Sequence, residues 1–182
     1  FYIEAGAQVE IIAGCGIHND GGQESRHDGI HTFHVGKGCN VKYVENHYAE
    51  GNGTGQKVLN PVTKIFVGED SVFTLETTQI KGVDSTEREN YIELADNAKL
   101  FVTEKLMTDD GQTAVSNMDV ELNGADSSAR IVSRSVGKGK SRQVFHPRAI
   151  GSNRCHAHVQ CDSIIMDEAE ISSIPEIDAK HV

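Results

Sequence analysis

The densest group of metal-ligating side chains in the sequence is the segment Cys155-His-Ala-His-Val-Gln-Cys161. Thiolates and imidazoles are the ligands that zinc and iron-sulfur centres use. In a strand, side chains alternate between two faces, which places Cys155 and Cys161 on one face and His156 and His158 on the other. Either these four residues hold a soft metal with help from a neighbouring element or a second subunit, or the cysteines simply fill buried positions.

The other candidate residues carry weaker signals. Cys15 lies between two glycines, and its surroundings assign it no role. Histidines scattered at this spacing are more often solvated or hydrogen-bonded than metal-bound. We find no serine-hydrolase or HExxH motif and no carboxylate pair that recurs at one phase, so we predict no catalytic activity of the chain's own. The scattered histidines are His18, His27, His31, His34 and His47.

Composition narrows the class of protein. The chain has 182 residues, 37% hydrophobic and 24% charged, with a net charge of -10 spread along its length. That charge disfavours nucleic acid and anionic membranes as partners. No apolar run approaches the roughly 18 residues of a membrane span, and no signal peptide is recognisable. The four cysteines do not form the framework of a small secreted domain. We therefore expect a cytoplasmic protein with reduced thiols.

An internal repeat predicts the elements that position these residues. Each copy has an aliphatic residue, a polar or Gly-rich turn, a small residue four positions on and an apolar residue six positions on. Apolar and polar residues alternate after each turn, as they do in strands. The copies begin at Ile3, Val35, Val67, Leu94, Leu122 and Ile165, and the copy at Leu122 carries one extra residue, so that Ser127, Ala129 and Ile131 fill its later positions.

A step of about 30 residues is typical of one coil of a β-solenoid, in which each coil buries its inward side chains by stacking on its neighbours. We therefore predict an all-β fold of about six coils with two short strands each, with residues 1–182 as a single domain. Close stacking explains the small residue at each turn, and this assigns Cys39 a structural role. The small residues are Ala7, Cys39, Ser71, Ala98 and Ala169.

Three stretches do not fit the repeat clearly. Residues 77–93 and 109–118 show weak alternation, and we expect loop or short turns there. The final step of 43 residues is too long for one coil, so strands in 132–160 are not placed. Its Gly-Lys-Gly-Lys-Ser segment from Gly137 lacks the spacing of a phosphate-binding loop, and we expect a basic surface turn.

Other functions remain open at this point. A hexapeptide-type acyltransferase repeats a six-residue motif in tandem, whereas here each copy of such a motif stands alone in its coil. A β-helix lyase needs carboxylates stacked at one phase for a divalent cation. A sandwich of hairpins or an inert structural module would also fit short alternating strands.

The segment Gln160-Cys161-Asp162-Ser163-Ile-Ile-Met, with Asn153-Arg154 before it and Ile174-Pro175-Glu176-Ile177 after it, resembles the late core of SufB/SufD proteins. Two earlier stretches, Gly29-Ile-His-Thr-Phe-His-Val and Val41-Lys-Tyr-Val-Glu-Asn-His-Tyr48, are also similar to this family. The resemblance therefore covers essentially the whole chain.

This resemblance implies a right-handed parallel β-helix that acts as a scaffold in the SUF system of iron-sulfur cluster assembly. It implies a transient iron-sulfur cluster as cargo, with Cys161 as the matching sulfur acceptor or cluster ligand. It also implies a SufC-type ATPase, a sulfur donor protein and a second SufB/SufD-type subunit, in a homodimer or heterodimer, as partners. Phe1 stands inside an apolar pattern, so we expect the chain to be a fragment of a longer one.

Overall fold

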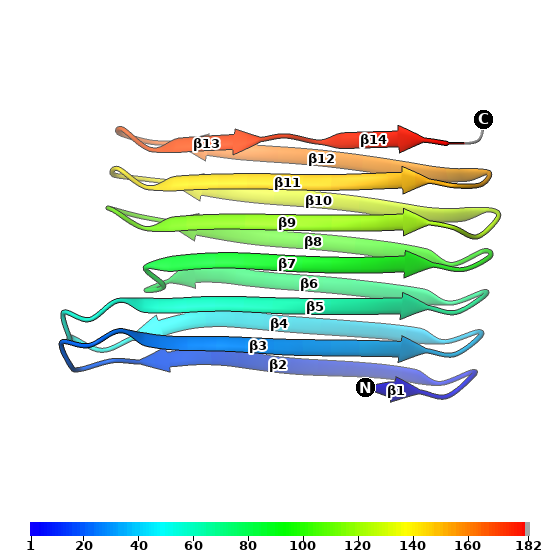
Figure 1. The fold of residues 1–182 in the computed structure, drawn as a ribbon, viewed down its shortest axis with the longest axis horizontal. Coiled ribbons are helices and arrows are strands. Elements are labelled where there is room, and N and C mark those ends of the chain that lie inside the picture. Colours follow the sequence, from blue (N-terminus) through cyan, green and yellow to red (C-terminus); the bar gives the residue numbers. More distant parts are fainter. Residues whose placement is uncertain (181–182) are drawn as a thin grey trace.

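Strands account for all the regular structure in residues 1–180, the part of the chain that the computed structural model describes. The chain climbs from one end to the other as a stack of coils (Figure 1). The expectation of an all-β solenoid is confirmed, although most strands have 10 or 11 residues and are not short. The domain prediction runs to Val182, and its last two residues lie outside the described part. No helix within residues 1–180 has the length and apolar character needed to cross a membrane.

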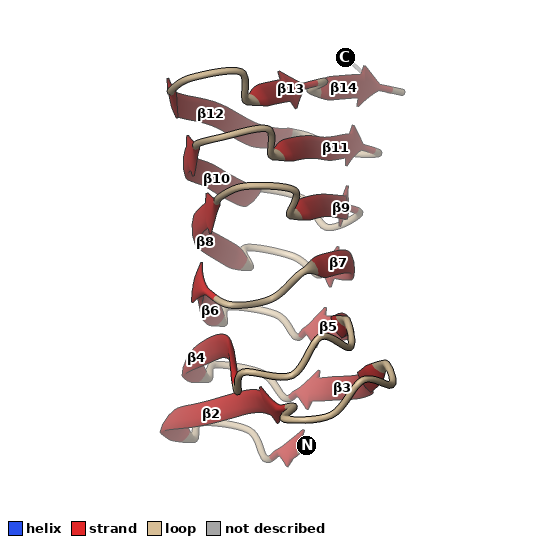
Figure 2. Cartoon of the chain, turned by 90° about the vertical axis from the view of Figure 1, so that its left-hand side faces the viewer, coloured by secondary structure: helices blue, strands red, loops and turns tan. Residues whose placement is uncertain are grey.

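The strands form two parallel sheets that face each other (Figure 2). Sheet A contains β1 (Tyr2–Ile3), β3 (Ser25–Val35), β5 (Lys57–Val67), β7 (Ser85–Leu94), β9 (Thr113–Leu122), β11 (Arg142–Gly151), β13 (Glu170–Ser173) and β14 (Glu176–Ala179). Sheet B contains β2 (Gln8–His18), β4 (Asn40–Glu50), β6 (Val72–Lys81), β8 (Lys99–Thr108), β10 (Ser127–Gly137) and β12 (Cys155–Ile165).

The coils wind in a right-handed sense. In Figure 1 the strands of sheet A run to the right in front, those of sheet B return behind, and the chain rises with each circuit. This is the hand that parallel crossover connections adopt almost without exception. The hexapeptide acyltransferase alternative requires the opposite hand, so the winding disfavours it.

Alternation of apolar and polar residues explains how each strand contributes to the core. On β8, Leu100 and Val102 point inward and are 1% and 2% exposed, while Phe101 between them points outward and is 42% exposed. Val41 and Tyr43 on β4 are fully buried in the same way. One continuous hydrophobic cluster therefore runs along the axis between the two sheets.

The register between strands shows that the repeat copy predicted to begin at Ile165 was misplaced. Along the edge where sheet A passes to sheet B, the coil step is 32, 27, 28 and then 29 residues. Ile165 does not belong to this column, because it pairs with Gly137 at the opposite edge, half a coil away. Both edges share the same tight turn, in which Ala98 and Ala169 each donate to the carbonyl three residues earlier at 3.2 Å. The column consists of Val35, Val67, Leu94, Leu122 and Gly151.

The expectation of loop at 77–93 and 109–118 was wrong for most of both stretches. Residues 85–94 form β7 and residues 113–122 form β9, and only short turns separate them from β6 and β8. The alternation was hidden because several inward-facing side chains here are polar, including Thr77, Gln79 and Arg88. The polar interior of the solenoid is thus the reason that the sequence pattern failed.

Stacked turns use residues that tolerate a left-handed backbone. At the A-to-B edge this position has φ between 56° and 76°, a conformation that favours Gly, Asn and Asp. The amide of Asp126, for example, donates to the carbonyl of Arg154 in the next coil at 2.7 Å. The five residues in this position are Gly6, Gly38, Asp70, Asn97 and Asp126.

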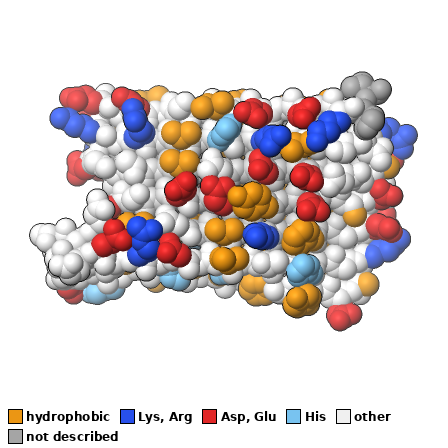
Figure 3. All heavy atoms as spheres, viewed as in Figure 1, with side chains coloured by type: hydrophobic (Ala, Val, Ile, Leu, Met, Phe, Trp, Pro, Cys, Tyr) orange, Lys and Arg blue, Asp and Glu red, His pale blue; other side chains and the backbone are white. Residues whose placement is uncertain are grey.

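The outer face of sheet A carries intermixed acidic and basic side chains with hydrophobic ones between them (Figure 3). Part of this face is a stack of flat rings in which Tyr2, His34 and Phe66 lie one above another, with centroids 4.9 and 5.1 Å apart. His34, one of the candidate histidines, therefore has a packing contact on the outer surface and does not face the interior.

Candidate functional site

The predicted cluster on β12 is divided between two faces of the strand. Cys155 and Cys161 point inward and are partly buried, whereas His156 and His158 are exposed on the outer face. The two cysteines are six residues apart, which corresponds to about 20 Å along a strand. These four side chains therefore do not converge on one ion within the described chain. A ligand role for Cys155, His156 or His158 stays a prediction.

Two of the cysteines occupy turn positions. The amide of Cys39 donates to Ser71 Oγ at 2.9 Å, and its thiol donates to the Glu4 carbonyl at 3.1 Å. Cys155 pairs with Ser127, the small residue of the preceding coil, and so fills the same turn position as Cys39. Both thiols are therefore in places where the stack requires a small side chain.

Cys161 has different surroundings. It lies on β12, which ends sheet B among the described strands, and it pairs with Ser133 of β10. Burial raises the pKa of the Cys161 thiol; a hydrogen bond with Ser173 opposes this, and the negative charges of Asp162 and Glu104 add to the rise. The thiol is thus protonated at neutral pH in this arrangement.

Register places Cys161 in a polar row on the inner face of sheet B. Moving one strand at a time from β2 to β12, each residue of this row pairs with the next. We call this set the inner row; it consists of Ala13, Glu45, Thr77, Glu104, Ser133 and Cys161. Two carboxylates, two hydroxyls and one thiol therefore lie along the axis of the solenoid. The adjacent row begins with Cys15 and His47.

Arg88 of β7 crosses the interior to this row. Its Nη1 donates to Glu104 Oε2 at 2.8 Å, and its Nη2 donates to His47 Nδ1 at 2.7 Å. Glu104 also accepts hydrogen bonds from Ser116 at 2.7 Å and Ser133 at 3.1 Å. Arg88 is 1% exposed. The network is compatible with burial because each charged group has charged or hydroxyl partners.

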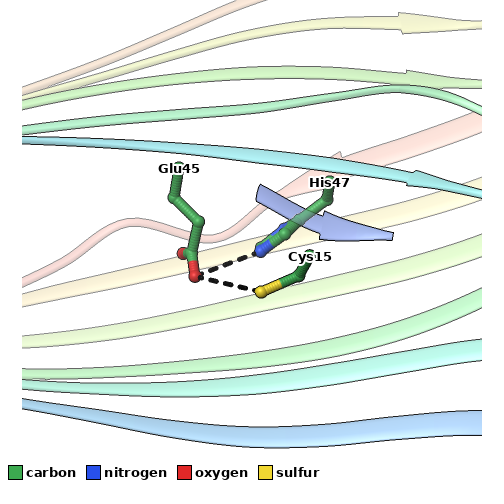
Figure 4. A group of neighbouring side chains, drawn as sticks. All are labelled: Cys15, Glu45 and His47. Carbon is green, nitrogen blue, oxygen red and sulfur yellow. Dashed lines mark hydrogen bonds and ion pairs between the residues drawn. The ribbon is translucent and has the colours of Figure 1, made fainter. Parts of the chain in front are cut away.

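Cys15, Glu45 and His47 converge beside this network (Figure 4). One ligand atom from each lies within 4.8 Å of the others. Cys15 Sγ is 4.0 Å and His47 Nε2 is 3.3 Å from Glu45 Oε1. All three residues are buried. This trio, which the sequence did not identify, is therefore the group within residues 1–180 whose geometry suits a metal ion.

Glu45 is ionised despite its burial. Burial alone would raise the pKa of its carboxyl, but the adjacent His47 imidazole, the charge of Arg88 and the Tyr43 hydroxyl outweigh it and lower the pKa to about 2. Burial raises the pKa of Tyr43, so its hydroxyl stays protonated and donates to Glu45 Oε1 at 3.0 Å. Burial also lowers the pKa of His47, which is therefore neutral.

A connection to the surface passes through His31. Its Nδ1 lies 2.6 Å from the Tyr43 hydroxyl and 3.1 Å from Glu45 Oε1, and its side chain is 26% exposed. Of the scattered histidines, His31 and His47 thus meet at one carboxylate, while His18 is exposed and pairs with Asp20. The 32-residue step would have revealed part of this group, because it aligns Cys15 with His47 in adjacent coils.

Comparison with known proteins decides the family. The family model described as the SUF system FeS cluster assembly SufBD core domain matches residues 1–182. The chain belongs to the SufBD family. The predicted resemblance is therefore confirmed, and the chain is an iron-sulfur cluster assembly domain of SufBD type.

Curated relatives of the chain carry the same family name. An iron-sulfur cluster assembly SufBD family protein of Methanothermobacter thermautotrophicus is 24% identical over 180 residues, covering 96% of this chain and 42% of the relative. One from Archaeoglobus fulgidus is 26% identical, covering 98% and 47%. One from Methanocaldococcus jannaschii is 23% identical, covering 95% and 54%. The SufBD chain spans about half the length of these relatives.

Proposed function

We propose that this SufBD domain is the scaffold core of a SUF-type assembly complex, and that Cys161 accepts sulfur and ligates the nascent iron-sulfur cluster. The observation that supports this role most directly is the position of Cys161. It is a partly exposed thiol on the strand that ends sheet B, and it continues the polar inner row. Cys39 is buried in a turn. Cys155 also lies partly exposed on β12, but it fills the turn position equivalent to that of Cys39, so neither continues the inner row.

Sulfur transfer to Cys161 requires its thiolate. In this step the thiolate attacks the outer sulfur of a donor persulfide, an S–S bond forms on Cys161, and the donor leaves as a thiolate. No net oxidation or reduction occurs. Because the pKa of Cys161 is raised, its proton must first leave to a base. We propose that the sulfur donor protein provides that base when it docks.

Cluster assembly also requires further ligands, because an iron-sulfur cluster is held by several thiolates or imidazoles. We propose that a second SufB/SufD-type subunit, in a homodimer or heterodimer, supplies them at the open side of β12. We further propose that a SufC-type ATPase binds the complete protein, that the assembly acts in the cytoplasm, and that it is a scaffold without catalytic activity of its own.

An enzymatic alternative has less support. The hexapeptide acyltransferases wind left-handed with hexads in tandem, whereas these coils wind right-handed with two long strands each. A lyase requires stacked carboxylates open to substrate, but Glu45 and Glu104 are each 1% exposed. An inert structural module would give no reason for two buried carboxylates in the inner row.

Anaerobic iron and sulfide reconstitution of the complete gene product with its SUF partners tests the proposal. We expect Cys161→Ser to abolish the visible absorption of the cluster and Cys39→Ser to leave it. Far-ultraviolet circular dichroism checks that both variants keep the strand spectrum. If Cys161→Ser builds cluster at the unmodified rate while Cys39→Ser does not, the assignment of Cys161 is wrong.

A further inference from the structure

The trio of Cys15, Glu45 and His47 has unused binding capacity. Glu45 Oε2 is buried without a hydrogen-bond partner among the described residues, and His47 Nε2 makes no hydrogen bond although it lies 3.3 Å from Glu45 Oε1. Glu45 is 1% exposed and His47 is 2% exposed, so bulk water does not satisfy these atoms. A buried polar atom without a partner destabilises the folded state. Unpartnered ligand atoms of this kind, grouped with the Cys15 thiol, give the trio the capacity to hold an ion.

Charge in the interior points to a cation. Within residues 1–180, the fully buried charged groups are the carboxylates of Glu45 and Glu104 and the guanidinium of Arg88. Arg88 makes its direct ion pair with Glu104. Among the described ion pairs, Glu45 contacts only the imidazoles of His47 and His31, whose nitrogens lie 3.3 and 3.1 Å from its Oε1. Buried carboxylates are paired or coordinate metals, and Oε2 of Glu45 is free to ligate an ion.

We propose that Cys15, Glu45 and His47 bind a divalent transition-metal ion of borderline softness, of the Fe²⁺ and Zn²⁺ class. One thiolate, one carboxylate and one imidazole match the ligand preferences of these ions, while calcium and magnesium take oxygen ligands. The thiolate and the carboxylate together neutralise a divalent charge. Three protein ligands leave a fourth position for water or an incoming sulfur species.

Binding releases one proton. The metal–sulfur bond replaces the S–H bond of Cys15, whose pKa is raised by burial and by the charge of Glu45. Glu45 Oε1, the Tyr43 hydroxyl and His31 Nδ1 form a continuous set of short contacts from this thiol to the surface. The proton leaves along that path. Metal binding should therefore acidify an unbuffered solution by one equivalent.

Arg88 adjusts when the ion binds. Its hydrogen bond to His47 Nδ1 leaves the imidazole proton on Nε2, the atom that must ligate. The proton therefore moves to Nδ1, and Nη2 of Arg88 turns toward Gln79 Oε1, which is already 3.4 Å away. The ion pair of Arg88 with Glu104 is retained through Nη1.

This site is distinct from the proposed cluster position. Cys15 lies on β2 and Cys161 on β12, at opposite ends of sheet B. Metal binding at Cys15 goes beyond the proposed function. It is measured separately from cluster formation at Cys161, so either proposal can be wrong while the other holds.

Anaerobic titration with Co²⁺ tests the site. The protein is the complete gene product with Cys155→Ser and Cys161→Ser, which removes the thiols of β12. We expect one equivalent of Co²⁺ to give thiolate-to-cobalt charge-transfer absorption and to release one proton. Adding Cys15→Ser should abolish this absorption, and adding Cys39→Ser should leave it, since both replace a buried thiol.

Two further variants address the other ligands. Glu45→Gln and His47→Gln should keep the thiolate band but weaken Co²⁺ binding at least about tenfold, because even the hydrogen-bond partners of metal ligands contribute that much. If Cys15→Ser does not fold, Cys15→Ala replaces it, with circular dichroism as the check. The proposal is overturned if the starting protein shows no charge-transfer band, or if the band survives removal of Cys15.

Discussion

Arg88 and Glu104 join the two sheets of the solenoid through a buried ion pair, with Nη1 2.8 Å from Oε2 and both side chains 2% exposed. Replacing Arg88 with alanine leaves Glu104 charged in the interior with hydroxyl partners alone. We expect Arg88→Ala to lower the free energy of unfolding by about 3–5 kcal/mol. Urea denaturation measures this value.

A surface pair provides the matched control. Arg142 contacts Glu170 at 2.7 Å, but the two side chains are 66% and 67% exposed. Arg142→Ala should therefore cost less than about 1 kcal/mol. Equal losses from Arg88→Ala and Arg142→Ala would contradict the view that burial gives the interior pair its importance.

Acid should weaken the fold through Glu45. Its pKa is 4.5 as an ordinary group and about 2 in the folded protein, so the native state favours the ionised form. The resulting stabilisation is complete above pH 4.5 and is lost as the pH falls toward 2. We expect Glu45→Gln to show a shallower decline of unfolding free energy between pH 5 and about 2 than the parent. Parallel declines would exclude Glu45 as a source of the pH dependence.

Turn geometry predicts opposite effects for two glycines. A Cβ on Gly124 would lie 2.0 Å from the carbonyl carbon of Ala95 in the preceding coil, whereas one on Gly111 would meet nothing within 4 Å. We expect Gly124→Ala to destabilise by about 1–3 kcal/mol through overpacking. Gly111→Ala should be neutral or stabilise by up to about 1 kcal/mol. Thermal unfolding compares the two, and a harmless Gly124→Ala would refute the tight stacking.

Neighbouring residues on β8 test the alternation of its faces. Leu100 is 1% exposed in the core and Phe101 is 42% exposed on the outer face. Leu100→Ala should cost about 2–5 kcal/mol because it leaves a cavity. Phe101→Ala should cost less than about 1 kcal/mol, since surface changes are usually small. Chemical denaturation that finds the larger cost at Phe101 would show that the register is shifted by one residue.

The coil was predictable from sequence because close stacking imposes the same small residue at the same place. Cys39 follows this rule, and so does Cys155, which pairs with Ser127. The copy at Ile165 was misplaced because the turns at both edges share one hydrogen-bond pattern. Local pattern identifies the kind of turn, while only the register distinguishes the two edges.

The candidate site was harder to predict. Residues in direct contact there are as far as 41 positions apart in the sequence, as with Arg88 and His47, and the members come from both sheets. Arg88 reads as a solvated charge in a polar segment, although it is buried. Pairing across the sandwich depends on how the two sheets face each other, and no repeat within the sequence specifies that. The alignment of Cys15 with His47 is the exception, because both belong to one sheet.

The regular pairing of sheet B gives the molecule a fixed scale of length. Neighbouring strands lie about 4.8 Å apart, and five such intervals separate β2 from β12, so Cys15 and Cys161 stand about 24 Å apart along the axis. Inserting or deleting one whole coil between them would change this separation by one interval and leave each local environment intact. The number of coils therefore fixes the distance between the two thiols, and this distance can change during evolution only by whole strand intervals.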